Sequence, residues 1–483
     1  MSYMSYMTTR NKEVVIMSNQ FTGRNIITTD LPEITRSNVL NLINDTKYLH
    51  DVNSNKINYL YNYYRGEQPI QQKTKETREE INNIVTENRA YEIVSFKKGY
   101  TFGEPVQYIC RGDNANSVTD ITLLNDYMVM CNKNKLDCDL AEWILICGVG
   151  YRLVLPNPLW SKDSDESPVS IYTLDPRSTY VVRYNDYKKQ ILAGVTFVKH
   201  DDNSYTYHVY TSTEYYRIEN DIIVETRPLY LGYIPIIEYT SGNARLGSFE
   251  VVLPLLDAIN NVQSLRIDDI QQHVDAILAI FGGDMDQDTY DKLKDWKTLV
   301  LPEGVDAKYL TAVLDQSGVQ TLANALYQTV LTICGMPNRN GGSSTSDTGQ
   351  AVILRDGWTS AETQAKNLES EFVVSEKNFL KVVLRIIRDL GGTTLKLIDI
   401  EVKFGRRYAD NILTKVQALT QLLDCGIEPK IAIATCGIWN DPLDVAVQSK
   451  DYLDNRWGID DSLDEDSGNT EDNLVMNNVW INW

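Results

Sequence analysis

The chain has 483 residues, and its 46 Lys and Arg against 66 Asp and Glu give a formal net charge of −20. A hydrophobic fraction of 43% is enough to build packed cores and excludes wholesale disorder, whereas the acidic balance argues against a protein that wraps nucleic acid through clustered cations. The length allows about two to four domains, and the longest apolar runs fall far short of the roughly 20 residues that cross a bilayer, so we expect a soluble protein with no membrane segment.

The first half of the chain is predicted to be mixed α/β. Residues 1–36 are polar and weakly periodic, which predicts a flexible N-terminal arm. Helical spacing of apolar residues begins near residue 37 and again near residue 88. Residues 150–240 consist of short runs rich in Tyr, Val, Ile and Thr between Asp, Asn, Gly and Ser turns, which predicts a β-rich meander. We therefore expect residues 37–248 to form one α/β unit.

The second half is predicted to be helical with one polar interruption. Apolar residues from Val252 through Ile270 to Phe281 recur on helical spacing and predict a helix over 249–281, about 45 Å long. A polar insertion at 282–315 follows.

A second helix is predicted over 316–336, with Leu322 and Ile333 on its apolar stripe. It is followed at 337–348 by the chain's only low-complexity loop, rich in Asn, Gly and Ser.

The C-terminal part is predicted to contain one very long helix and several short ones. Within residues 349–404, apolar residues such as Ala361, Phe372 and Phe379 alternate in steps of four and three, which predicts a helix of about 40 residues followed by a strand. Short helices are expected at 405–458. Residues 459–483 are acidic, with no Lys or Arg, and are predicted to be a solvated tail.

Motifs for catalysis or metal binding are scarce. Asp284, Asp286 and Asp288 have the spacing that opens a calcium loop, but Thr289 stands where that loop needs glycine. The alternative is a solvated acidic segment that begins a helix. The sequence has no P-loop, dinucleotide fingerprint, hydrolase elbow or zinc motif, so we expect no enzyme, no cofactor and no metal site.

Five segments together resemble one protein family. In chain order they are YNYYRG at 61–66, GYTFGEPV at 99–106, CGVGY at 147–151, YIPIIEY at 233–239 and LTICGMP at 331–337. Their order and spelling resemble the portal proteins of tailed double-stranded-DNA bacteriophages of the long-tailed type, from about residue 38 to about residue 425. No single motif is diagnostic, because none is catalytic, so the resemblance rests on the colinear set.

The resemblance implies an α+β, mainly α, fold with the parts of a phage portal. These parts are a wing at 37–248 that resumes with a long helix and strand at 349–404, stem helices at 249–281 and 316–336, a clip at 282–315, a tunnel loop at 337–348 and a crown at 405–458. The protein would form a homo-oligomeric ring, commonly of about twelve subunits, at the portal vertex of the virion capsid. Assembly would take place in the host cytoplasm.

The resemblance also implies a function and partners. The ring would be the channel for double-stranded DNA during packaging and ejection. It would dock the terminase large subunit and a head–tail adaptor, and contact the major capsid protein and scaffold. The alternative is another head–tail structural ring or adaptor without a portal role, although such proteins are usually shorter and lack paired stem helices around a clip.

Two groups of residues are candidate sites under this resemblance. The tunnel-loop residues offer hydrogen bonds to phosphate and include one full positive charge, at Arg339; they are Asn338, Arg339, Asn340, Ser343 and Ser344. The clip residues combine charge with one large aromatic side chain, as a docking surface does; they are Asp291, Lys292, Lys294, Asp295, Trp296 and Lys297. Two plainer interpretations stay open: the loop is a flexible linker, and Trp296 belongs to the core of the clip.

Overall fold

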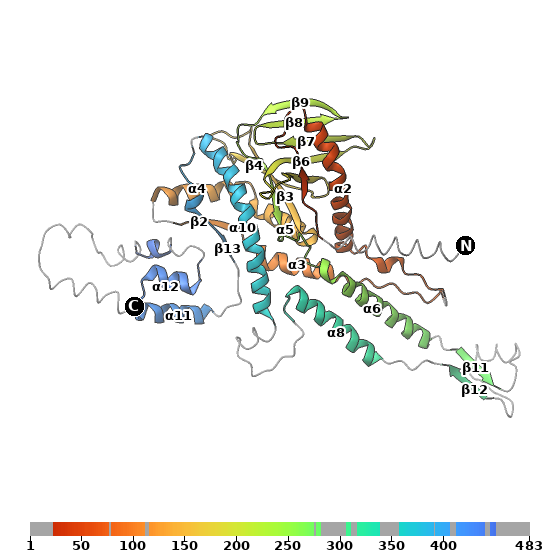
Figure 1. Ribbon diagram of the computed structural model, residues 1–483. Coiled ribbons are helices and arrows are strands. Elements are labelled where there is room, and N and C mark those ends of the chain that lie inside the picture. The colour runs from red at the N-terminus through yellow and green to blue at the C-terminus, as the bar shows by residue number, and fades with distance from the viewer. Residues whose placement is uncertain are drawn as a thin grey trace, which may run out of the picture. The chain divides into compact units, whose positions relative to one another are not determined.

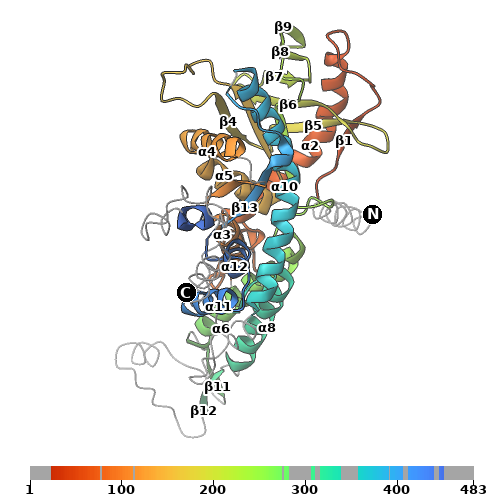
Figure 2. The same cartoon turned by 90° about the vertical axis from the view of Figure 1, so that its left-hand side faces the viewer.

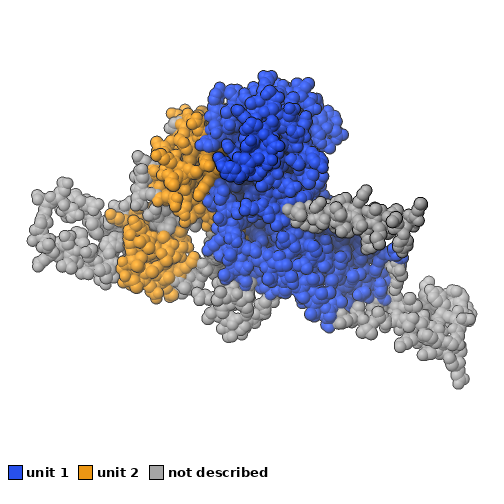
Figure 3. Space-filling view, in the orientation of Figure 1, with its two compact units in different colours: residues 1–98, 140–153, 173–375 blue, residues 99–139, 154–172, 376–483 orange. Residues whose placement is uncertain are grey.

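The computed structural model describes residues 23–76, 79–111, 115–274, 277–281, 306–310, 316–338, 357–390, 392–405, 412–439 and 445–450. These residues belong to two compact units, coloured separately in Figure 3. The first unit comprises residues 1–98, 140–153 and 173–375, and the second comprises 99–139, 154–172 and 376–483. Every helix in the described part of the chain is too short or too polar to cross a lipid bilayer.

Strands β3 to β10 follow one another along the chain and the helices lie mostly before and after them, as in an α+β protein. The helices are α2 (Val39–Tyr64), α3 (Arg89–Phe102), α4 (Ala115–Met130), α5 (Lys133–Cys147), α6 (Leu253–Val274), α8 (Gln316–Cys334), α10 (Trp358–Asp389), α11 (Ile412–Asp424) and α12 (Pro429–Cys436), with 3₁₀ turns η1 (Pro69–Gln72), η2 (Glu250–Val252) and η3 (Leu397–Asp399). The strands are β1 (Ile27–Thr29), β2 (Val106–Cys110), β3 (Val149–Pro156), β4 (Val169–Leu174), β5 (Thr179–Tyr184), β6 (Ile191–Lys199), β7 (Tyr205–Tyr210), β8 (Glu214–Glu219), β9 (Ile222–Pro228), β10 (Ile236–Thr240), β11 (Ile277–Phe281), β12 (Asp306–Leu310) and β13 (Ile400–Phe404).

The predicted β-meander is confirmed. Strands β5 to β9 pair antiparallel with their neighbours in chain order and form a six-stranded sheet with β1 at one edge (Figure 2). Alternate residues such as Tyr180, Val182 and Val195 are buried, and they pack with Val39 and Leu42 of α2 in one apolar core. The sheet is therefore stabilised by a helix that precedes it by more than a hundred residues.

The prediction of a flexible arm over 1–36 is wrong for its described part, residues 23–36. Strand β1 pairs in parallel with β5, with Ile27 opposite Val182, and Ile27 and Ile34 lie in the sheet's core. The Arg24 guanidinium forms a buried ion pair with Glu250, at 2.5 Å between Nη2 and Oε1. The strand is only three residues long, Ile-Thr-Thr, which is too short to give a periodic signal, and this is why the sequence did not predict it.

The second unit has its own small core. Strands β2 and β13 pair antiparallel, with Cys110 opposite Ile400, so the strand predicted at the end of 349–404 is confirmed only for residues 400–404. The Lys133 ammonium lies 2.6 Å from the Asp137 carboxylate and 2.8 Å from that of Glu376. All three side chains are buried, so their charges stabilise one another away from solvent.

Helices α6 and α8 lie side by side (Figures 1 and 2). In the chain, the hairpin of β11 and β12 stands between the end of α6 and the start of α8. The helix predicted over 249–281 is therefore wrong at its end, because it stops at Val274 and residues 277–281 form a strand. The run ILAIF fits either a helical stripe or a buried strand, and its pairing with β12, Ile277 opposite Leu310, decides for the strand.

Helix α10 is the longest in the described part of the chain, with 32 residues spanning about 48 Å. The predicted apolar register is confirmed, because Ala361, Ala365, Phe372 and Phe379 are all buried. The remaining residues of the 40 predicted lie outside the described part.

Candidate functional site

Most of the candidate residues lie outside the described part of the chain. They are the loop residues Arg339, Asn340, Ser343 and Ser344, the clip residues Asp291, Lys292, Lys294, Asp295, Trp296 and Lys297, and the acidic residues Asp284, Asp286 and Asp288. Asn338 is described and lies half-buried at the end of the segment that follows α8. Among the described residues, no group of three His, Cys, Asp or Glu side chains is placed to hold a metal ion.

The structure does show where the loop of residues 339–356 begins and ends. Met336 and Pro337 are buried directly after α8, and Gly357 directly precedes α10. A Cβ atom built on Gly357 would lie 3.8 Å from the Met336 carbonyl oxygen and 3.9 Å from the Pro337 Cα. The chain therefore leaves and re-enters the fold at one place, as a closed loop does.

Three helices meet at the base of this loop. Lys97 Nζ on α3 donates a hydrogen bond of 2.9 Å to Gln364 Oε1 on α10. Gln364 in turn lies against Gly335 at the end of α8, because a Cβ atom there would come within 2.3 Å of Gln364 Nε2. Gly335 has a φ of +60°, so both its backbone and its surroundings require glycine. Burial lowers the pKa of Lys97 and raises that of Cys334 to about 11.

Polar contacts fix α8 to its neighbours. Arg266 on α6 donates hydrogen bonds of 2.9 and 2.6 Å to the side-chain oxygens of Gln316 and Gln320. Tyr327 Oη donates a bond of 2.8 Å to Glu92 Oε1 on α3, and the Arg89 guanidinium carbon lies 4.0 Å from the centre of the Tyr327 ring. Arg266 therefore joins the two paired helices to each other, and Tyr327, in the middle of α8, holds the pair to α3.

The predicted apolar stripes of this helix pair are partly wrong. Five large apolar side chains are 42–51% exposed, although three of them belonged to the stripes; they are Leu265, Ile267, Ile270, Leu322 and Ile333. The side chains that are buried in α6 after Ile259 are polar instead: Asn260, Ser264 and Asp268, each with 0% exposure. The sequence signal for this buried polar face of α6 was a polar residue at every fourth position.

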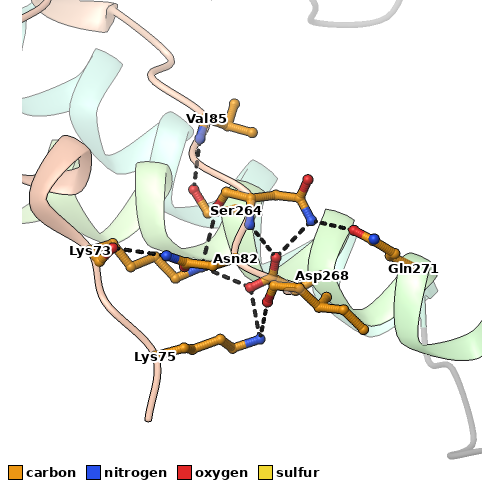
Figure 4. A network of polar contacts seen from close by, with 9 residues as sticks. Lys73, Lys75, Asn82, Val85, Ser264, Asp268 and Gln271 are labelled. Carbon is orange, nitrogen blue, oxygen red and sulfur yellow. Dashed lines mark hydrogen bonds and ion pairs between the residues drawn. The ribbon is translucent and has the colours of Figure 1, made fainter. Parts of the chain in front are cut away.

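These three side chains accept hydrogen bonds from the backbone of an extended segment, and Figure 4 shows Ser264 and Asp268 with the contacts around them. The bonds run from Glu87 N to Asn260 Oδ1 at 2.8 Å, from Val85 N to Ser264 Oγ at 3.0 Å and from Asn83 N to Asp268 Oδ1 at 2.7 Å.

Asp268 also receives two cations. Lys73 Nζ and Lys75 Nζ lie 2.8 and 3.0 Å from Asp268 Oδ2. Burial acts to raise the pKa of Asp268, but hydrogen bonds from Lys73, from the backbone and side chain of Asn83 and from Lys75 hold it well below its usual range. The carboxylate is therefore charged and saturated with donors.

The comparison with protein families identifies the chain. Residues 44–442 match the family described as phage portal protein, SPP1 Gp6-like. Because the match covers most of the chain, the protein belongs to this family. Membership confirms the α+β, mainly α, portal fold that the resemblance implied, and it gives the chain a portal or head–tail connector role in a phage-like particle.

Solved structures of gene transfer agent particles are similar to this chain. One is the neck of an empty particle, with 14% sequence identity and a TM-score of 0.47, over 72% of this chain and 90% of that one. Another is the virion of the native particle, with 14% identity and a TM-score of 0.42, over 72% of this chain and 89% of that one. No curated protein matches the chain.

Proposed function

We propose that the protein forms a closed ring at the portal vertex of a phage capsid and that double-stranded DNA passes through the ring during packaging and ejection. The ring also docks the terminase large subunit and, later, a head–tail adaptor. The observation that carries this proposal is the outer surface of the α6–α8 pair. A portal of this family needs a lateral contact between subunits, and these helices expose apolar side chains that one subunit leaves uncovered.

The exposed side chains support lateral packing of copies. Leu265, Ile267 and Ile270 on α6 and Leu322 and Ile333 on α8 are each more than two-fifths exposed. Burying the rest of each side chain against a neighbour contributes about 1 kcal/mol. A head-to-tail contact, in which this face of each copy meets a different face of the next copy, closes into a ring of about twelve subunits when the rotation between copies is right.

The loop predicted at 337–348 would line the channel. Pro337, at its start, lies beside Gly357, which precedes α10. Each copy would present Arg339, flanked by Asn338 and Asn340, toward the DNA. One cation per subunit in an otherwise acidic ring contacts phosphate without holding it, which is what a moving polymer requires.

The proposed clip is the segment of residues 282–315, which includes β12. Residues 282–305 connect the two strands of the hairpin. A docking surface there comes after the first stem helix, α6, and before the second, α8. The candidate contacts are Asp291, Lys292, Lys294, Asp295, Trp296 and Lys297, whose mixed charge and single aromatic side chain suit a partner that binds reversibly.

Electron microscopy and native mass spectrometry of the purified protein test this proposal. We expect closed rings with a central hole and one dominant subunit number. A chain that stays monomeric at micromolar concentration, with scaffold protein present, would overturn the ring. A ring that joins tails but never enters a capsid would favour a head–tail adaptor.

A further inference from the structure

The extended segment that lies on α6 matches the helix in its spacing. We call residues 73–76 and 79–87 the strap. Alternate residues of an extended chain are about 6.6 Å apart, and residues four apart on a helix are about 6 Å apart along its axis. The amides of Glu87, Val85 and Asn83 therefore meet successive turns of α6, and each of the three finds an acceptor side chain. Figure 4 shows the part around Ser264 and Asp268.

Asp268 is the acceptor nearest the end of α6 that leads to the clip. Besides Lys73 and Lys75, the Asn83 side-chain amide donates to it at 2.9 Å and also to Gln271 Oε1 at 2.9 Å. The same lysines bind strap carbonyls, with Lys73 Nζ 3.3 Å from Asn83 O and Lys75 Nζ 3.0 Å from Ile81 O. One buried carboxylate thus joins both arms of the strap to the helix.

The distal half of α6 depends on these polar contacts. The buried apolar side chains of the helix are Leu253, Leu256 and Ile259, all in its first two turns. Beyond them, in the part of α6 whose side chains are described, the fully buried residues are polar. Losing an acceptor there leaves a buried amide without a partner, and losing Asp268 leaves two cations without their carboxylate.

We propose that Asp268, with Ser264 and Asn260, is a positioning residue for the clip. The strap holds the distal half of α6 in place, and α6 ends at Val274, three residues before β11 begins at Ile277. The direction in which the β11–β12 hairpin leaves the stem is thereby set by a segment far earlier in the chain, whose Asn83 lies 185 residues before Asp268. The consequence for motor docking rests on the proposed function.

Hydrogen–deuterium exchange of the assembled ring tests whether the contacts between the strap and α6 hold β11 in place. Asp268→Asn keeps the shape of the side chain but removes its charge, and Asp269→Asn, on the neighbouring exposed residue, makes the same charge change as a control. We expect the amides of Asn83 and Val85 and those of β11 to exchange at least about tenfold faster in D268N and at the wild-type rate in D269N. Faster exchange in the strap with unchanged β11 would overturn the proposal, because the contacts would then fasten the strap alone.

Docking of the terminase large subunit on the same rings tests the consequence. We expect D268N to weaken the complex by about tenfold with rings intact, and D269N to bind as the wild type does. Equal affinity of D268N and wild type would overturn the positioning role. A wild-type ring that does not bind the motor would refute the proposed function and leave the exchange result standing. If D268N fails to assemble, Ser264→Ala removes a single acceptor and must show the same pattern at Val85 and β11.

Discussion

A buried histidine makes the stability of the first unit depend on pH. His50 is 1% exposed, stacks on Tyr180 with 4.5 Å between ring centres, and has Nε2 3.0 Å from the Arg177 carbonyl oxygen. Burial lowers the pKa of His50 from 6.5 to about 4. Between these two values the unfolded chain binds a proton that the folded chain does not, so stability is lost as the pH falls through this window.

We therefore predict that His50→Gln, which can still donate to the Arg177 carbonyl, reduces the pH dependence of stability. Between pH 7 and 4 the free energy of unfolding of the wild type should fall by about 3 kcal/mol more than that of the variant. Denaturant titrations of both proteins at the two pH values measure this difference. Parallel losses in the two proteins would show that His50 does not titrate in this range.

Glycine 335 is a second residue whose environment fixes its identity. Ala at this position must adopt a φ of +60° and displace the Gln364 side chain that Lys97 holds. We predict that Gly335→Ala lowers the free energy of unfolding by about 1–2 kcal/mol. Gly99→Ala is the matched control, because a Cβ atom there meets nothing within 4 Å and the residue lies inside α3. Thermal unfolding that shows equal effects would contradict the account of the loop base.

At the scale of elements, local pattern predicted what local contacts determine. The β-meander followed from composition, because each of its strands pairs with the next strand along the chain, and the register of α10 followed from the period of its apolar residues. The strand β1, by contrast, pairs with Val182, and the buried side chains of α6 bond residues more than 170 positions earlier. Asn260, Ser264 and Asp268 are polar, so no apolar pattern marks them, and only the fold identifies their partners. The loop and clip residues that the resemblance implied remain predictions.

The loop between α8 and α10 gives a prediction at this scale. Deleting residues 340–346 should leave ring assembly and capsid incorporation intact, because the ends of the loop already lie together and need no long connection. Packaging or retention of DNA should fall, since the loop would no longer reach the polymer. The measurement is the amount of genome per particle, with Arg339→Gln separating the role of charge from that of length. Normal packaging and retention by the deleted phage would show that the loop is a linker.

The proposed clip gives another prediction at the scale of elements. Lys292→Glu with Lys294→Glu reverses two charges in the segment between β11 and β12. We predict intact rings with weaker binding of the motor or the adaptor, because complementary charge orients such complexes and steers their association. Binding measured at two salt concentrations checks the electrostatic origin, since the difference from wild type should shrink at high salt. Unchanged packaging and tail joining would count against this docking surface.

At the scale of the whole molecule, net charge and exposed apolar surface have opposite effects on ring formation. A formal charge of −20 per subunit makes copies repel one another, and in a ring this repulsion acts between every pair of neighbours. Lateral contacts must therefore supply enough apolar burial to overcome it. Salt screens the repulsion and leaves apolar burial largely intact, so ring formation should be favoured at moderate ionic strength.

The stem surface can be tested by one substitution and its matched control. Leu322 on α8 is 51% exposed and Leu159, outside the helices and strands, is 76% exposed. Leu322→Glu should convert rings into monomers or open oligomers, because it places a charge in the proposed lateral contact and adds to a repulsion that is already large. Leu159→Glu makes the same chemical change at a more exposed site and should leave the rings closed. Native mass spectrometry reports the subunit number, and circular dichroism checks that both variants are folded. Closed rings in L322E would place the subunit contact elsewhere, and loss of rings in both variants would show that added charge alone, rather than the stem surface, prevents closure.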